Sequence, residues 1–174
     1  DDDQAADASD LDEHGLKIQT YISTVLVVVP PADYAETTLR YARSALYNVK
    51  VGPRSVSTAT EDLIKGVFQD EFQVDGPIAG ERMENYSGVV FVGGRGATQL
   101  EENSECLRLA REAAEAGKLI AAWDYSVGVL AKAGVVRGRR VTSIERLRGE
   151  LKAAGAKFTG RQIEIDKNLV TAID

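Results

Sequence analysis

The chain is poor in the residue types on which most catalytic sites depend. It contains one cysteine, Cys106, and one histidine, His14, so a disulfide within this sequence is excluded. A histidine-based catalytic triad and a histidine-rich metal site are both disfavoured for the same reason. Cys106 lies in a helical pattern, Glu105–Ala110, where a small buried side chain is the more natural interpretation than a reactive thiol. We therefore expect neither a metal nor a cofactor.

Long hydrophobic runs and basic patches are also missing. No apolar stretch approaches the roughly 20 residues that a membrane-spanning helix needs. The sequence contains no basic cluster with interleaved aromatic residues of the kind that binds nucleic acid. The 27 acidic residues exceed the 21 basic ones, but seven of the acids fall within residues 1–13, before the first basic residue, Lys17. The acidity therefore belongs to a terminal segment, and we expect a cytoplasmic protein that binds neither nucleic acid nor membrane.

Length and composition indicate a single globular domain. A chain of 174 residues is long enough to bury a substantial core. Residues 1–16 have the composition of an acidic, flexible leader. Residues 17–174 contain no internal repeat and no composition shift that marks a second domain. We therefore treat 17–174 as one folding unit.

Strand patterns and helix patterns alternate along the chain. Strands are predicted from runs of β-branched and other apolar residues at 22–29, 54–59 (after a Gly52-Pro53 turn), 86–92 and 119–123, with shorter ones at 154–158 and 162–171 around a turn at 166–168. Helices are predicted at 33–47, 99–116, 127–133 and 143–154, and a hairpin at 63–74 with its turn at 69–70. The alternation predicts a three-layer α/β/α sandwich with a mostly parallel, flavodoxin-like sheet.

The stretch from Gly117 to Ser143 carries the strongest signal for function. Leu119–Trp123 has the length of a buried strand, and Val127–Ala133 has a helical pattern that ends at Gly134. Only the polar segment Asp124–Ser126 separates the two. A strand that enters a helix through so short a turn has the layout of a nucleophile elbow, which presents one side chain at the carboxyl end of a parallel sheet.

The second half of this stretch, AGVVRGRRVTS at residues 133–143, closely resembles the ThiJ/PfpI family, a branch of the class I glutamine-amidotransferase-like fold. In that family the preceding strand ends in Cys-His-Gly-Pro. Here the cysteine position is Asp124, the histidine position is Tyr125, and Ser126-Val127 replace the Gly-Pro pair. The resemblance extends over about residues 22–171 and implies the family's fold and self-association, as a homodimer or a larger oligomer. Thiol peptidase, deglycase and redox-sensor chemistry are not expected, because a carboxylate replaces the thiol.

Two further segments fit the same resemblance. Gly93-Gly94 follow a predicted strand, where the family uses backbone amides to form an oxyanion pocket, although alone the pair would indicate a plain turn. Arg95 either adds a positive charge to that pocket or lies exposed in the loop. Glu36 matches a glutamate that the family buries beside its nucleophile. From the residues alone, Asp33 to Glu36 also fits a capping box at a helix start.

Three interpretations of the site remain open. In the first, which we favour, Glu36 and Asp124 form a carboxyl pair with a shared proton, and the protein binds a small polar ligand or has a protein-maintenance role without turnover. In the second, Asp124 is the nucleophile or general base of a hydrolase, lyase or hydratase that acts on a small carbonyl or amide compound. In the third, Asp124 only caps the following helix. Tyr125 either donates a hydrogen bond in the site or packs at a subunit interface.

Overall fold

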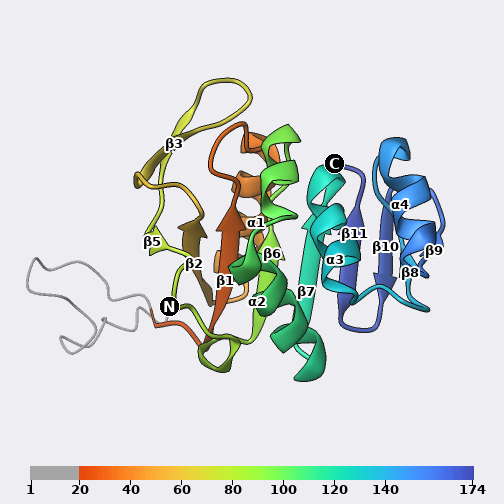
Figure 1. The fold of residues 1–174 in the computed structure, drawn as a ribbon. Coiled ribbons are helices and arrows are strands. Elements are labelled where there is room, and N and C mark those ends of the chain that lie inside the picture. Colours follow the sequence, from red (N-terminus) through yellow and green to blue (C-terminus); the bar gives the residue numbers. More distant parts are fainter. Residues whose placement is uncertain (1–19) are drawn as a thin grey trace, which may run out of the picture.

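A seven-stranded sheet forms the centre of the computed structural model, which describes residues 20–174 (Figure 1). Its strands are β1 Ser23–Val29, β2 Val51–Ser57, β5 Gly76–Pro77, β6 Gly88–Phe91, β7 Leu119–Trp123, β10 Ile163–Asp166 and β11 Leu169–Ala172. Their spatial order is β10-β11-β7-β6-β1-β2-β5, and only the β10–β11 pair is antiparallel. The predicted mostly parallel sheet is therefore confirmed, whereas the predicted leader at 1–16 lies outside the described residues.

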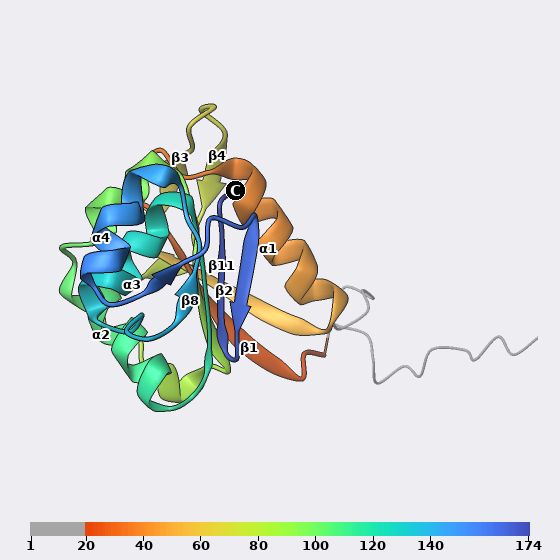
Figure 2. The ribbon, with the colours of Figure 1, turned by 90° about the vertical axis from the view of Figure 1, so that its right-hand side faces the viewer.

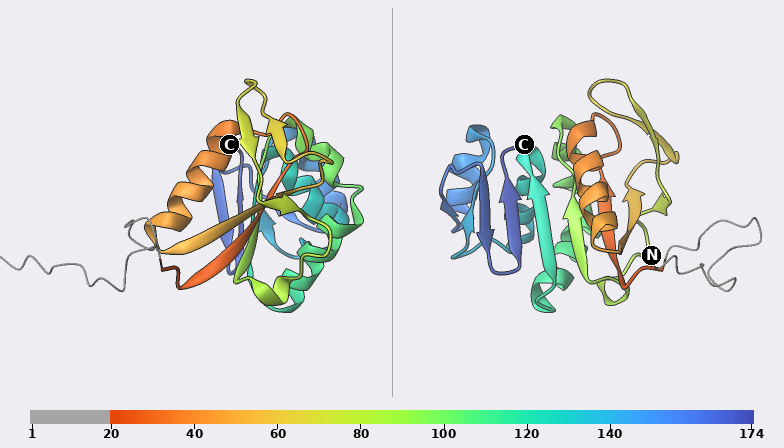
Figure 3. Two further views of the ribbon diagram at one scale, coloured as in Figure 1. Left: turned by 90° about the vertical axis from the view of Figure 1, so that its left-hand side faces the viewer. Right: turned by 180° about the vertical axis from the view of Figure 1, so that it is seen from behind.

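Helices cover both faces of this sheet and complete three layers. The helix α1 (Glu36–Asn48) lies on one face, and α2 (Ser104–Glu115), α3 (Val127–Ala133) and α4 (Arg148–Ala153) lie on the other (Figure 2). Figure 3 shows α1 in front of β1 and β6 when the molecule is seen from behind. Among residues 20–174, no helix is both long and apolar enough to cross a membrane.

The core explains why β1 is apolar at almost every position. Val25, Val27 and Val29 belong to the cluster on the α1 face. Leu26 and Val28 belong to the larger cluster on the face of α2, α3 and α4. A strand that is covered on both faces has no polar side, which is the usual pattern for a central parallel strand.

Short elements connect the larger ones. Single 3-10 turns are found at η2 Met83–Asn85, η3 Arg95–Leu100, η4 Asp124–Ser126 and η5 Glu145–Leu147. Two small ribbons flank the main sheet, β3 Leu63–Lys65 with β4 Glu71–Gln73, and β8 Arg140–Val141 with β9 Lys157–Phe158. The hairpin predicted at 63–74 is confirmed, but its connection spans 66–70 instead of 69–70. The longer turn forms because the Gly66 amide donates to the Asp70 carbonyl and Gly66 also pairs with Tyr34.

Several predicted boundaries are wrong, and three of them have a clear physical reason. The first helix begins at Glu36 and not at Asp33, whose φ of 51° is not helical. Gly52-Pro53 form no turn but lie within β2, where the neighbouring β5 pairs only with Val56 and Ser57. Pro53 is tolerated because β2 is an edge strand at that point and needs no donor there. The helix predicted at 99–116 is divided into η3 and α2, because the Asn103 side chain caps α2 by accepting from the Cys106 amide at 3.0 Å.

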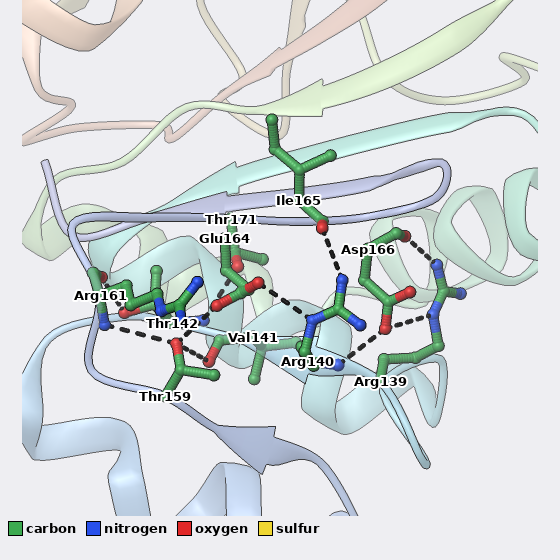
Figure 4. A network of polar contacts seen from close by, with 10 residues as sticks. All are labelled: Arg139, Arg140, Val141, Thr142, Thr159, Arg161, Glu164, Ile165, Asp166 and Thr171. Atoms are coloured by element: carbon green, nitrogen blue, oxygen red, sulfur yellow. Dashed lines mark hydrogen bonds and ion pairs between the residues drawn. The ribbon is translucent and has the colours of Figure 1, made fainter.

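A network of charged side chains joins β8 to β10 (Figure 4). Arg140 Nε lies 3.2 Å from Glu164 Oε1, and the Arg140 backbone amide donates to Asp166 Oδ2 at 2.8 Å. Arg139 Nε lies 3.5 Å from the same Asp166 oxygen, and the Thr159 hydroxyl donates to Glu164 Oε2 at 2.8 Å. Both acids are buried, and each has a cationic partner. We call these five residues the β10 acid network.

Candidate functional site

The turn between β7 and α3 places Asp124 at the carboxyl end of the sheet. Its φ is 41°, in the left-handed region that costs a non-glycine residue free energy. Two serines hold this conformation. Ser126 Oγ accepts from the Trp123 amide at 3.0 Å and donates to the Phe91 carbonyl at 2.8 Å, while the Ser143 hydroxyl donates to the Asp124 carbonyl at 2.5 Å. The predicted strand–turn–helix is therefore confirmed, but the role of the two supporting serines was not predicted.

Backbone amides bind one oxygen of the Asp124 carboxylate. Oδ1 accepts from the Gly94 amide at 2.8 Å and from the Tyr125 amide at 2.5 Å. Oδ2 has no hydrogen-bond partner among the residues that the structure describes, yet it is not sealed from solvent as Glu36 Oε2 is. The residue as a whole is 9% exposed. Asp124 is thus a buried carboxylate with one oxygen satisfied and the other open.

The electrostatic environment of Asp124 raises the pKa of its carboxyl above that of an exposed aspartate. Burial raises the pKa of this carboxyl above its ordinary value, the Gly94 and Tyr125 amides lower it, and the nearby Asp174 carboxylate raises it again. The net effect is a raised pKa, and no cationic side chain is among its causes. A buried acid without a cationic partner is unusual, and such groups gather at functional sites.

The loop after β6 approaches Asp124 closely because it is built from glycine. A Cβ on Gly93 would lie 2.3 Å from Asp124 Oδ2. Gly94 has a φ of 105°, and its Cβ would lie 2.4 Å from the Asp33 carbonyl oxygen. A side chain at Gly94 would require movement of the backbone, and one at Gly93 would displace the Asp124 carboxylate. The amide that the sequence suggested for an oxyanion is occupied here by a carboxylate of the chain itself.

The Glu36 side chain lies against Gly66 and makes no hydrogen bond to Asp124. Its Oε1 accepts from the Phe68 amide at 2.7 Å, and its buried Oε2 has no partner. The pocket that Glu36 lines does not include Asp124, and the acid that acts on Asp124 is Asp174. The predicted proton-sharing pair of Glu36 and Asp124 is therefore not formed. The predicted capping box is wrong as well, because Ala35 is the N-cap and makes no side-chain cap bond.

Tyr125 and Arg95 lie outside the pocket beside Asp124. The Tyr125 ring packs against the larger core cluster, and the Arg146 guanidinium carbon lies 5.9 Å from the ring centroid. Arg95 forms an ion pair with Asp33 at 3.1 Å, and its side chain is 61% exposed. Of the two alternatives for Arg95, the exposed loop position is the one observed.

A pocket of about 430 Å³ opens beside Asp124. It is lined by Ala35, Thr37, Thr38, Tyr41, Trp123, Asp124 and Asp174. The lining combines carboxylates, hydroxyls and aromatic rings, and no lysine or arginine from residues 20–174 belongs to it. Thr37, Thr38, Tyr41 and Asp174 were not predicted as pocket residues, because only the packing of α1 on the sheet brings them to Asp124.

The cysteine thiol is unreactive, and the side chains that could bind a metal do not cluster. Cys106 is fully buried, and burial raises the pKa of its thiol to about 12, so the prediction of an unreactive thiol is confirmed. Between residues 20 and 174, no three His, Cys, Asp or Glu side chains are grouped as a metal site requires. The open oxygen of Asp124 is therefore the group that the pocket offers to a ligand.

Comparison with known proteins gives consistent relationships. The model of the DJ-1/PfpI family matches residues 23–174. An uncharacterized protein of Archaeoglobus fulgidus is 30% identical over 129 residues, which span 73% of this chain and 77% of that protein. A Pyrococcus horikoshii protein named as a deglycase is 28% identical over 89 residues, 51% of this chain and 54% of that protein. Among solved structures, a ThiJ/PfpI domain protein from Brachyspira murdochii gives a TM-score of 0.81 at 19% identity and 86% coverage of both chains.

Proposed function

The chain belongs to the DJ-1/PfpI family, and from this premise we propose that it is a member without thiol catalysis that binds a small polar ligand at Asp124. One observation carries the proposal: Oδ1 of Asp124 accepts hydrogen bonds from both the Gly94 and the Tyr125 amides. In a nucleophile elbow, the amide of the residue after the nucleophile and an amide of a neighbouring loop bind the oxyanion of the substrate. Here the chain supplies its own anion to these donors.

A carboxylate at the position of the family's cysteine has a different chemistry from a thiolate. It is a weaker nucleophile, and it resembles in charge and shape the sulfinate to which a cysteine is oxidised. With Oδ1 held by two amides, a substrate oxygen finds no free donor pair for a tetrahedral intermediate. This occupancy supports binding over acyl-transfer turnover. A protein-maintenance role of the same kind, without turnover, fits the same geometry.

The experiment compares the wild-type protein with Asp124→Asn and Asp124→Cys. The substrates are methylglyoxal and its adduct with a free amino acid, because several relatives are named as deglycases. We expect no turnover by the wild-type protein or by Asp124→Asn. Native-state alkylation with iodoacetamide should modify the new thiol of Asp124→Cys and leave Cys106 unmodified, because the Cys106 thiol is buried with a raised pKa. Wild-type turnover that Asp124→Asn abolishes would overturn the proposal.

A second candidate function is a hydrolase or lyase in which Asp124 is the general base or nucleophile. The observation that favours it is the open Oδ2 of a buried carboxyl with a raised pKa. The occupied amides count against it. A screen of small esters, amides and hydratable carbonyl compounds tests it, and turnover must disappear in Asp124→Asn. Turnover that survives that substitution would exclude Asp124 as the reacting group.

We also propose that the protein self-associates through the β3–β4 hairpin. Leu63 and Phe68 on this hairpin are 50% and 79% exposed, and neighbouring exposed apolar side chains commonly mark protein interfaces. Phe68→Ser should lower the molar mass that light scattering measures after size exclusion. Ile163→Ser, at an apolar position of 56% exposure on β10, is the matched control. Dissociation by the control alone would place the interface at β10.

A further inference from the structure

The pocket beside Asp124 carries negative charge without a compensating cation. Asp124 and Asp174 both line it, and no lysine or arginine does. The Asp174 carboxylate accepts a hydrogen bond from the neutral Gln162 amide, so this partner does not cancel its charge. Arg95, the cation of the neighbouring loop, is paired with Asp33. An anionic ligand would therefore meet two carboxylates and no positive side chain.

The open oxygen of Asp124 indicates which kind of ligand atom suits the pocket. Asp124 is 9% exposed, and its Oδ2 accepts no hydrogen bond from the described residues. An open oxygen on a carboxylate that is otherwise buried gains more from a charged donor than from a neutral one. A ligand that carries N–H groups with a positive charge would satisfy Oδ2 and balance the two acids.

The remaining walls suit the same ligand. Trp123 and Tyr41 contribute aromatic rings, which attract ammonium and guanidinium groups. The Thr38 hydroxyl donates to the Ala35 carbonyl at 3.1 Å and keeps its lone pairs free to accept from a ligand. The volume of about 430 Å³ lies within the range of small-molecule sites.

One feature of the pocket favours the opposite charge. The amino end of α1 contributes Ala35, Thr37 and Thr38 to the lining, and a helix N-terminus carries about half a positive charge. The two carboxylates of Asp124 and Asp174 outweigh that partial charge. The net preference is for a cation.

We propose that this pocket selects a small primary ammonium or guanidinium compound. The inference rests on the proposed function, because it names the ligand class of the same site. Oδ2 of Asp124 accepts from the ligand's charged N–H groups, Asp174 adds attraction across the pocket, and the rings of Trp123 and Tyr41 cover the cationic head.

The chain contains a built-in reporter for this proposal, because Trp123 is its only tryptophan. The experiment follows tryptophan fluorescence while n-butylammonium, n-butylguanidinium, n-butanol or butyrate is added at constant ionic strength. We expect a saturable change with the two cations and at least about tenfold weaker binding of butanol and butyrate. A blocked arginine derivative in a further arm distinguishes a free amine from an arginine side chain as the source of the cation, and tighter binding of either supports the cationic class.

Two variants and a control localise the binding. Asp124→Asn keeps the shape of the side chain and should weaken binding of the cations about tenfold. Tyr41→Ala removes a ring that is 66% exposed and therefore leaves the fold intact, and it should weaken binding several-fold. Asp62→Asn makes the same chemical change as Asp124→Asn at an exposed position outside the pocket and should leave the affinity unchanged.

Several results would overturn the proposal: butyrate or butanol binding as tightly as the cations, saturable binding of none of the cations, or full affinity in both Asp124→Asn and Tyr41→Ala. Such results leave the proposed function standing, because a ligand of another class still fits a protein without turnover. Conversely, wild-type turnover that depends on Asp124 removes the proposed function and leaves the cation selectivity to be judged by these titrations.

Discussion

Two acidic sites in this molecule expose little of their surface area but are electrostatically opposite. Asp124 is 9% exposed, and Glu164 and Asp166 of the β10 acid network are 5% and 8% exposed. Burial raises the pKa of Asp124. The Thr159 hydroxyl and Arg140 hold the pKa of Glu164 below its ordinary value, and the Arg140 amide and the nearby guanidinium groups do the same for Asp166.

The comparison shows that partners, and not burial alone, determine the role of an acid. In the β10 acid network the carboxylates receive charge-assisted contacts from arginine, which stabilise their ionised forms (Figure 4). At Asp124 two neutral amides bind one oxygen and the other oxygen is open. The network is therefore a structural link between β8 and β10. Asp124 retains the unsatisfied capacity that a ligand site requires.

The largest expected effect is a loss of stability when the glycine loop that holds Asp124 is changed. Gly94→Ala places a Cβ 2.4 Å from the Asp33 carbonyl oxygen at a φ of 105°, so we expect a loss of more than about 3 kcal/mol in the free energy of unfolding, or no folded protein. Gly80→Ala is the control, since its φ is 79° with open space around it, and should cost about 1–2 kcal/mol. Equal losses in urea denaturation would contradict the close approach of this loop.

The next effect tests whether the network is structural. Asp166→Asn removes the negative charge that faces Arg139 and the Arg140 amide, so it should lower the thermal midpoint by roughly 2–4 °C at neutral pH. Differential scanning calorimetry measures this change. Asp62→Asn, at an exposed position, should leave the midpoint almost unchanged. An unchanged midpoint in Asp166→Asn would remove the contrast between the two sites.

The same substitution at Asp124 should act in the opposite direction. Asp124→Asn keeps an oxygen for the Gly94 and Tyr125 amides, removes a buried charge that lacks a cation, and suits the φ of 41°. We expect a gain of about 0.5–1 kcal/mol at neutral pH, kept small by solvent screening at the open Oδ2. Urea denaturation checks the sign. Destabilisation comparable to that of Asp166→Asn would mean that Asp124 is a structural acid.

The smallest effect is the pH dependence of these differences. Because the pKa of Asp124 is raised on folding, its contribution to stability is present at acid pH and is lost as the pH rises through the folded pKa. The gain from Asp124→Asn should therefore be absent below about pH 3.9 and grow above it. The pKa values of Glu164 and Asp166 are lowered on folding, so their contribution is lost as the pH falls. Thermal midpoints of the wild-type protein and each variant are measured from acid to neutral pH. The change in midpoint caused by Asp124→Asn and the change caused by Asp166→Asn should vary with pH in opposite directions.

Local sequence patterns were sufficient to predict the turn at Asp124 but not the pocket beside it. The apolar run Leu119–Trp123, the polar Asp124 and the helical pattern after it lie within a short segment, so their arrangement follows from spacing. Glu36 was misplaced because its partner, the Phe68 amide, lies 32 residues away and reaches it only through the hairpin. The capping signal at Asp33 failed because Ala35 is the N-cap of α1, and the Asp33 carboxylate pairs with Arg95 instead.

The pocket itself depends on contacts between distant elements. Tyr41 of α1 and Asp174 after β11 meet Asp124 only when α1 packs on the sheet. Neither has a motif of its own, so no reading of a single segment finds them. The pairing of β10 acids with Arg139 and Arg140 was equally hidden, because the partners are more than 20 residues apart.

An NMR titration measures most directly whether the Asp124 carboxylate occupies the Gly94 and Tyr125 amides. The carboxyl carbon of Asp124 and the two amide protons are followed from acid to neutral pH. We predict that all three titrate together with one pKa, above the ordinary value for aspartate, and that the two amide shifts lose this transition in Asp124→Asn. Amide protons that do not respond when the Asp124 carboxyl titrates would contradict the central claim, because the donors would then be free for a substrate.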